Sequence, residues 1–122
     1  MGLKYVLDTK VILFHFGGRL ANPLPLPDSS VSIMSRIELL SYPDISGSEE
    51  RKVRDFLRWI PVFPLLDDVA ESAIRLRRGH RLRVPDAVIA ATAEVLGATL
   101  LTNDRRLLDF PGVPAREARL IE

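Results

Sequence analysis

The sequence predicts an α/β protein: a three-layer α/β/α sandwich in which helices cover both faces of a mainly parallel central sheet. Short, nearly continuous apolar runs at residues 3–7 and 99–101 are typical of strands buried on both faces. Segments with helical periodicity separate such runs. Repeated alternation of strands and helices is typical of parallel sheets, because parallel strands need long crossover connections.

Length and composition predict a single domain over residues 1–122. The chain is 47% hydrophobic and has a net charge of +1, which indicates a well-filled globular protein. No apolar stretch approaches the roughly 20 residues of a membrane span, and no secretory signal pattern is present, so we expect no membrane association. The chain has no cysteine, which excludes disulfides and thiolate ligands and fits a cytoplasmic location.

In the first half of the chain, the helix at 48–60 has the clearest pattern. Its apolar residues recur at helical spacing, and Trp59 lies beside this stripe, which favours a place in the core over the alternative, a partner-binding surface. Ser48 is its expected N-cap. The preceding elements are predicted as a strand at 3–7, a helix at 9–16, a proline-rich loop at 21–30, a strand at 31–33 and a helix capped by Ser35.

The second half of the chain continues the alternation. A strand at 62–66 is expected at a sheet edge, because Pro64 cannot donate a ladder hydrogen bond. Asp67 or Asp68 is expected to cap a helix that ends near Arg78. The remaining elements are predicted as a small-residue helix that starts at Pro85 and ends at Gly97, a strand at 99–101, a helical turn at 105–108 and a strand at 115–121.

Four carboxylates stand where these elements begin or end: Asp8, Glu38, Asp86 and Asp104. The functional crevice of an open parallel sheet lies beyond the carboxyl ends of its strands, so all four can converge there. None has an obvious Lys or Arg partner at helical spacing. Each like-charge pair costs roughly 4 kcal/mol at about 4 Å and an effective dielectric of about 20. A site that gathers them therefore indicates a divalent cation, Mg²⁺ or Mn²⁺.

Each carboxylate also has a simpler structural interpretation. Asp104 suits the N-cap of the 105–108 turn, and Asp86 suits the first turn of its helix, where the dipole contributes roughly 0.3–1 kcal/mol. Glu38 suits a solvated helix face. Asp8 is harder to explain in this way, because a carboxylate that closes a buried strand needs partners. The coincidence of all four favours a functional site.

These motifs together resemble those of PIN-domain ribonucleases, specifically VapC toxins of bacterial and archaeal toxin–antitoxin pairs. The likeness covers nearly the whole chain and lies in Asp8–Thr9 after a strand, Glu38 in SRIELLS, Asp86 in PDAVIAATA and Thr102-x-Asp104. It implies a metal-dependent endoribonuclease with these four acids as catalytic and metal-binding residues, Asp8 and Asp104 as direct ligands, and Thr9 and Thr102 in support. It also implies a cognate antitoxin bound in an apolar helical groove, and a homodimer.

Lys10 departs from this pattern, since the family usually has Asn or Ser there. Two outcomes follow: its ammonium reaches the acids and reduces metal binding and activity, which we favour slightly, or its side chain extends to solvent. In the second case little changes. A PIN fold disabled by Lys10, which would serve as an RNA- or protein-binding module, is therefore the alternative function. A receiver-like domain is disfavoured, because Glu38 and Asp86 would then have no role.

Arginines flank the proposed ligands and predict contacts to an RNA backbone. They lie just before Asp86 and just after Asp104; the residues expected to bind RNA are Arg78, Arg81, Arg83, Arg105 and Arg106. A solvated helix face is the alternative explanation. No row of aromatic residues accompanies them, so the sequence indicates no base preference. Neither histidine has a second His at ligand spacing, and both are expected to be non-catalytic.

Overall fold

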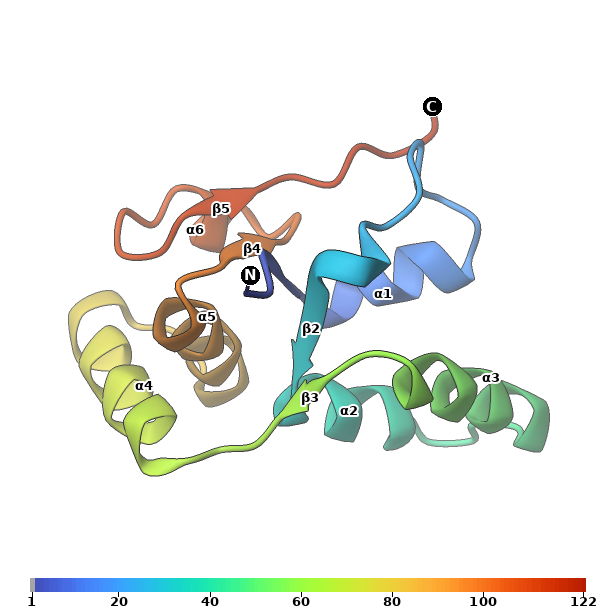
Figure 1. Cartoon of the computed structure of the whole chain (residues 1–122), viewed down its shortest axis with the longest axis horizontal. Coiled ribbons are helices and arrows are strands. Elements are labelled where there is room, and N and C mark those ends of the chain that lie inside the picture. Colours follow the sequence, from blue (N-terminus) through green and yellow to red (C-terminus); the bar gives the residue numbers. More distant parts are fainter. Residues whose placement is uncertain (1) are drawn as a thin grey trace.

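The computed structural model describes residues 2–122 and places five strands in one sheet, with helices on both faces (Figure 1). All neighbouring strands run parallel, in the order β3-β2-β1-β4-β5. The predicted three-layer α/β/α architecture is therefore confirmed. The strands are β1 (Tyr5–Leu7), β2 (Ser29–Ser32), β3 (Val62–Phe63), β4 (Thr99–Leu101) and β5 (Ala115–Arg116).

Among residues 2–122, six α-helices connect and cover these strands. They are α1 (Thr9–Phe16), α2 (Ile33–Leu40), α3 (Gly47–Arg58), α4 (Asp67–His80), α5 (Val84–Leu96) and α6 (Arg105–Leu108), with a short 3₁₀ turn η1 (Leu26–Asp28) before β2. No helix within residues 2–122 has both the length and the apolar character needed to span a membrane.

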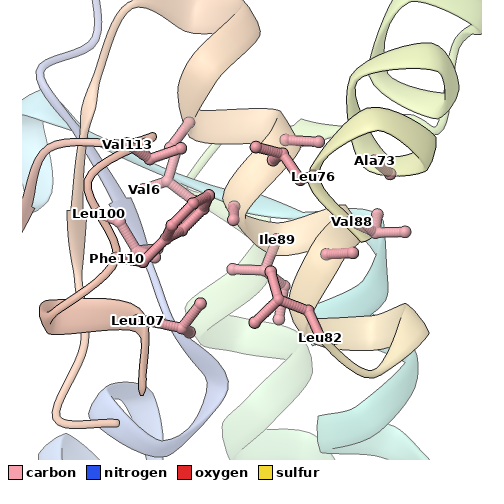
Figure 2. Packing of buried hydrophobic residues seen from close by; sticks show 14 of the residues in the cluster. Val6, Ala73, Leu76, Leu82, Val88, Ile89, Leu100, Leu107, Phe110 and Val113 are labelled. Atoms are coloured by element: carbon pink, nitrogen blue, oxygen red, sulfur yellow. The ribbon is translucent and has the colours of Figure 1, made fainter. Parts of the chain in front are cut away.

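Alternation along the two central strands divides the core into two parts. Val6 and Leu100 point to one face, whereas Leu7 and Leu101 point to the other. The first face packs under α4, α5 and α6, as Figure 2 shows for Val6, Leu100 and the side chains around them. The second face packs under α1, α2 and α3. Helices on both sides explain why Val6, Leu7, Leu100 and Leu101 are all apolar.

Helix α5 lies between the sheet and α4, and residues 86–93 are all buried. Its many alanines let it approach the sheet closely. Gly97 ends the helix with φ 65°, a left-handed conformation that glycine adopts at low cost, as expected from the sequence. Pro85 is the second helical residue instead of the first, because the helix begins at Val84.

Two predicted helix caps are wrong. Ser32, not Ser35, caps α2, because its hydroxyl accepts a hydrogen bond from Met34 N. Ser46, not Ser48, caps α3: its hydroxyl accepts from Glu49 N at 3.0 Å, and the Glu49 carboxylate accepts from Ser46 N at 2.9 Å. This reciprocal pair is a capping box, which the S-x-x-E spacing encodes.

Helix α4 and Trp59 also differ from the prediction. Leu66 takes the N-cap position of α4, while Asp68 accepts from Val69 N at 2.8 Å within the first turn. The helix continues to His80, past the expected end at Arg78. Trp59 is 83% exposed, so its placement in the core was wrong. It follows the last residue of α3, where the helical stripe no longer determines which way a side chain faces.

The outer strands are shorter than predicted. β3 is an edge strand, as Pro64 indicated, but it ends at Phe63 and does not reach residue 66. β5 ends at Arg116, and beyond it only Leu120 forms an isolated antiparallel bridge, with Leu20. β2 begins at Ser29, inside the segment that was predicted as loop.

Candidate active site

The register of the two central strands brings together the loops that follow them. Tyr5 pairs with Thr99 and Leu7 pairs with Leu101, so Asp8 and Thr102 come next on adjacent strands. The chain enters the sheet at β1, extends to β2 and β3 on one side, and returns to β4 on the other. The loops after β1 and β4 therefore flank the switch point of the sheet, where a crevice forms.

A cavity of about 420 Å³ opens at this edge of the sheet. All four predicted carboxylates contribute to its wall, so the structure brings together acids from four separate segments. Its lining residues are Asp8, Thr9, Lys10, Glu38, Ser41, Tyr42, Pro43, Arg83, Asp86, Asp104 and Arg106. Ser41, Tyr42 and Pro43 were not predicted, because the path of the connection after α2 leaves no motif in the sequence.

Asp8 is as deeply buried as Asp86; each is 7% exposed, and the other two acids are more exposed. It caps α1: its Oδ1 accepts from Thr9 N at 2.9 Å, and its Oδ2 accepts from the Thr102 hydroxyl at 2.7 Å. Burial raises the pKa of Asp8, and the negative charges of Asp86 and Asp104 add to that increase, although the two hydrogen bonds oppose it. Asp8 forms no ion pair within residues 2–122.

Thr102 connects two of the predicted site residues. It is fully buried, and its hydroxyl donates to Asp8 while it accepts from Asp104 N at 3.1 Å. One side chain therefore orients the Asp8 carboxylate and fixes the backbone at Asp104. A supporting role for Thr102 in a metal site stays a prediction.

Thr9 links α1 to α2. Its hydroxyl donates to Glu38 Oε1 at 2.7 Å and shares a 2.8 Å hydrogen bond with the Ser35 hydroxyl. Ser35 is fully buried and is the third residue of α2, so it cannot take the N-cap position. Its role was missed, although a serine one turn before Glu38 on the same helix face was a usable signal.

Arginines pair with Asp86 and Asp104, and the pair of Arg83 with Asp86 contradicts the expectation that no Lys or Arg partner lies at helical spacing. Arg83 Nε lies 3.2 Å from Asp86 Oδ2, and Arg106 Nη2 lies 3.5 Å from the same oxygen. Arg106 Nη2 also lies 3.1 Å from Asp104 Oδ2. The spacing of Arg83 to Asp86 is i, i+3, which places both on one side of the first turn of α5.

Asp104 both caps a helix and lines the cavity. Its Oδ1 accepts from Arg106 N at 2.9 Å, so it caps α6 as the simpler interpretation required. Partial burial raises its pKa, but hydrogen bonds from Arg106 and the charges of Arg106 and Lys10 outweigh this, and the pKa is lowered. Its carboxylate is therefore kept ionised while it lines the cavity.

Lys10 and the remaining arginines differ in their distance from the acids. Lys10 is exposed at the cavity rim and forms no ion pair with the part of the chain described, although its charge acts on Asp104. Arg78, Arg81 and Arg105 do not line the cavity. Arg105 instead lies 3.3 Å from Glu117. Only Arg83 and Arg106, of the five predicted RNA contacts, lie at the acids.

The histidines pack against aromatic rings and do not reach the cavity. His15 lies 5.4 Å from the Phe56 ring, and His80 lies 4.0 Å from the Phe110 ring, measured between centroids. Neither lines the cavity. Their expected non-catalytic character stays a prediction.

The carboxylates suit a hydrated hard cation. Among residues 2–122, no three Asp, Glu or His side chains are arranged to hold one metal ion directly. Mg²⁺ nevertheless keeps several waters and needs only one or two carboxylates. Asp8 meets that need. Each of its carboxylate oxygens accepts one hydrogen bond and can still bind a further partner, and no Lys or Arg side chain in the described residues pairs with its negative charge. The donor set therefore fits a divalent ion with few protein ligands.

Fold and cavity together define an α/β domain with a carboxylate site at the switch point of a parallel sheet. The sequence matches the PIN domain over residues 5–113, and the chain therefore belongs to the PIN-domain family. No curated protein matches the sequence significantly.

Solved structures with the same fold include toxin–antitoxin complexes. A toxin–antitoxin complex from Klebsiella pneumoniae superposes with a TM-score of 0.74 at 26% identity, covering 90% of this chain and 95% of that one. DNA-bound VapBC from Salmonella typhimurium gives 0.79 at 22% identity, covering 94% and 98%. VapBC2 from Rickettsia felis, bound to a promoter DNA fragment, gives 0.77 at 18% identity, covering 93% and 97%.

Proposed function

We propose that the protein is a divalent-metal-dependent endoribonuclease that hydrolyses RNA phosphodiester bonds as the cytoplasmic toxin of a toxin–antitoxin pair. The observation that carries the proposal is the cavity at the switch point, whose wall contains Asp8, Glu38, Asp86 and Asp104. Membership of the PIN-domain family and likeness to toxin–antitoxin structures support the same function.

In this proposal the buried end of the site holds Mg²⁺ or Mn²⁺. Asp8 is the principal protein ligand, oriented by Thr9 N and the Thr102 hydroxyl. Glu38, fixed by the Thr9 hydroxyl, binds the ion directly or through water, and Asp86 and Asp104 complete the acidic wall. A bound divalent ion lowers the pKa of coordinated water and neutralises charge on the phosphoryl group.

The residues of the rim contact the substrate. Arg83 and Arg106, which are 69% and 59% exposed, present guanidinium groups at the mouth of the cavity, where an RNA backbone approaches the acids. Arg78, Arg81 and Arg105 lie outside the cavity and would contact phosphates further along the strand.

The test is cleavage of a structured RNA by the purified chain. We expect cleavage with Mg²⁺ or Mn²⁺, none with excess chelator, and a loss of at least about 100-fold in the Asp8→Asn variant. Cleavage that persists in Asp8→Asn would remove the proposed mechanism. The variant must also retain the wild-type circular dichroism spectrum, so that loss of activity is not loss of fold.

The second candidate is a PIN fold without catalysis that binds RNA or protein. The observation that favours it is the number of cations at the acids: Arg83 and Arg106 pair with Asp86 and Asp104, and Lys10 stands at the rim. RNA binding without cleavage in either metal, unchanged in Asp8→Asn, would support this second function.

The antitoxin is proposed to bind a groove between α1, α2 and α3. This second cavity of about 420 Å³ is lined mainly by apolar side chains, among them Leu13, Phe16, Leu39 and Val53. An amphipathic helix suits such a groove. The partner is proposed to be encoded by a small neighbouring gene for a DNA-binding protein. The toxin itself is also proposed to form a homodimer.

Co-expression with the product of that neighbouring gene tests the groove. We expect wild type to co-purify with the partner and Phe16→Glu to lose it, because a carboxylate would be placed on the apolar wall. Trp59→Glu is the matched control, since Trp59 is exposed and lies outside the groove. Retention of the partner by Phe16→Glu would refute this location.

A further inference from the structure

The four acids of the cavity fall into two electrostatically different pairs. Asp86 and Asp104 share the guanidinium of Arg106, and Asp86 also has Arg83. Asp8 and Glu38 have only hydroxyl and backbone donors, and neither forms an ion pair in the described chain, residues 2–122. One side of the cavity is therefore neutralised by the protein itself, and the other is not.

We propose that Arg106 is a built-in counter-cation for Asp86 and Asp104, so that the cavity takes one divalent ion beside Asp8 and Glu38 and admits a second only when Arg106 is removed or displaced. This inference rests on the proposed metal-dependent function. It assigns a metal stoichiometry to the site and a residue that sets it.

The position of Arg106 follows from the start of α6. Asp104 caps this helix and accepts from Arg106 N at 2.9 Å, so the backbone of Arg106 is fixed two residues after the acid. From there the guanidinium spans both carboxylates, with Nη2 at 3.1 Å from Asp104 and 3.5 Å from Asp86. It therefore occupies the space between two oxygens that a second ion would need.

Arg106 opposes a second ion in two ways: its positive charge repels the ion, and its guanidinium competes with the ion for the carboxylate oxygens. A divalent ion placed between Asp86 and Asp104 would lie within a few ångströms of the guanidinium, and both would need the same Oδ2 atoms. The Asp8 side of the cavity has no such competitor. Arg106 is 59% exposed, so its side chain can also leave for solvent without opening the core.

The experiment is Mn²⁺ titration of the full chain, in the absence of RNA, by isothermal calorimetry and by the electron paramagnetic resonance signal of free Mn²⁺. We expect wild type to bind one ion. We expect Arg106→Ala to bind two ions. Arg105→Ala is the matched control, because Arg105 is adjacent in sequence but pairs with Glu117 outside the cavity.

Each outcome has a defined meaning. Two ions in wild type, or a single ion in Arg106→Ala, would overturn the role of Arg106 and leave the proposed nuclease intact if Asp8→Asn abolishes binding. No binding in wild type, Arg106→Ala and Arg105→Ala alike would overturn both proposals. An equal gain in Arg105→Ala would also count against Arg106, since it would reflect only the loss of one positive charge from the surface.

Discussion

The Thr102 hydroxyl donates a 2.7 Å hydrogen bond to Asp8 Oδ2, which joins residues 94 positions apart at the switch point of the sheet. Leu7 and Leu101, which precede them, are register partners on adjacent parallel strands. The pairing of β1 with β4 therefore orients the buried carboxylate. Errors in that register would separate the acid from its donor.

Thr102→Val keeps the shape of the side chain and removes its hydroxyl. Asp8 would lose a donor that favours its charged form, and Asp104 N would lose its acceptor. We expect roughly 10–100-fold weaker Mn²⁺ binding, as for other residues that orient metal ligands, and slower RNA cleavage. Calorimetry and a cleavage assay measure both effects.

Thr92→Val is the control for this change. Thr92 is also buried, but its hydroxyl donates to Val88 O within α5 and does not line the cavity. We expect its metal affinity to equal that of wild type. Equal losses in the two variants would mean that any buried threonine hydroxyl has this effect and that the bond to Asp8 has no special role.

Asp8→Asn is expected to stabilise the metal-free protein near neutral pH. Burial raises the pKa of Asp8 above its ordinary value of 3.8, so the ionised carboxylate destabilises the fold at any pH above the raised pKa. The variant removes that charge and should gain about 0.5–2 kcal/mol in the free energy of unfolding. Urea unfolding in chelator measures the gain.

The pH dependence separates this charge effect from a packing effect. As the pH falls through the raised pKa and then below 3.8, Asp8 becomes protonated in the folded and unfolded states, and its penalty disappears. The advantage of Asp8→Asn should therefore shrink in acid. A gain that stays constant from neutral pH to acid would contradict this explanation.

Lys10→Asn is expected to increase Mn²⁺ affinity several-fold and to speed cleavage. The charge of Lys10 acts on Asp104 from the exposed rim without a direct ion pair, so the gain is limited by solvent screening. Lys4→Asn is the control, because Lys4 is exposed before β1, at the far end of that strand from Asp8. Unchanged affinity and rate in Lys10→Asn would exclude interference by Lys10.

Helices α4 and α5 both end at a residue in the left-handed conformation, but that residue is an arginine after α4 and a glycine after α5. Substitutions at the two positions should therefore change stability in opposite directions. Arg81 follows α4 with φ 52° and Gly97 follows α5 with φ 65°, and a side chain at such angles costs roughly 1–2 kcal/mol. We expect Arg81→Gly to stabilise the protein and Gly97→Ala to destabilise it, each by about 1 kcal/mol. Thermal and urea unfolding would show opposite shifts; shifts in the same direction would contradict the argument.

The sequence predicts the layers of the fold and the residues of the cavity better than it predicts local contacts. Apolar runs and helical periods suffice for the α/β/α sandwich, because burial on two faces leaves a strong pattern in β1 and β4. The convergence of Asp8 and Asp104 follows from the position of each after a strand. Both are consequences of topology.

Contacts that depend on side-chain direction were harder to predict. Ser46 and Ser48 are both plausible caps, and only the reciprocal bonds with Glu49 distinguish them. Trp59 was placed in the core because its helix was extended by two residues. The pairs that Arg83 and Arg106 form with the acids were missed, although each arginine lies two or three residues from an acid in the sequence.

Both outer strands of the sheet are two residues long, and prolines border them: Pro61 and Pro64 flank β3, and Pro114 precedes β5. Unpaired strand edges act as templates on which another polypeptide adds by backbone hydrogen bonds, and short, proline-bordered edges suppress that addition. Both flanks of this sheet are therefore poor templates for the addition of another strand.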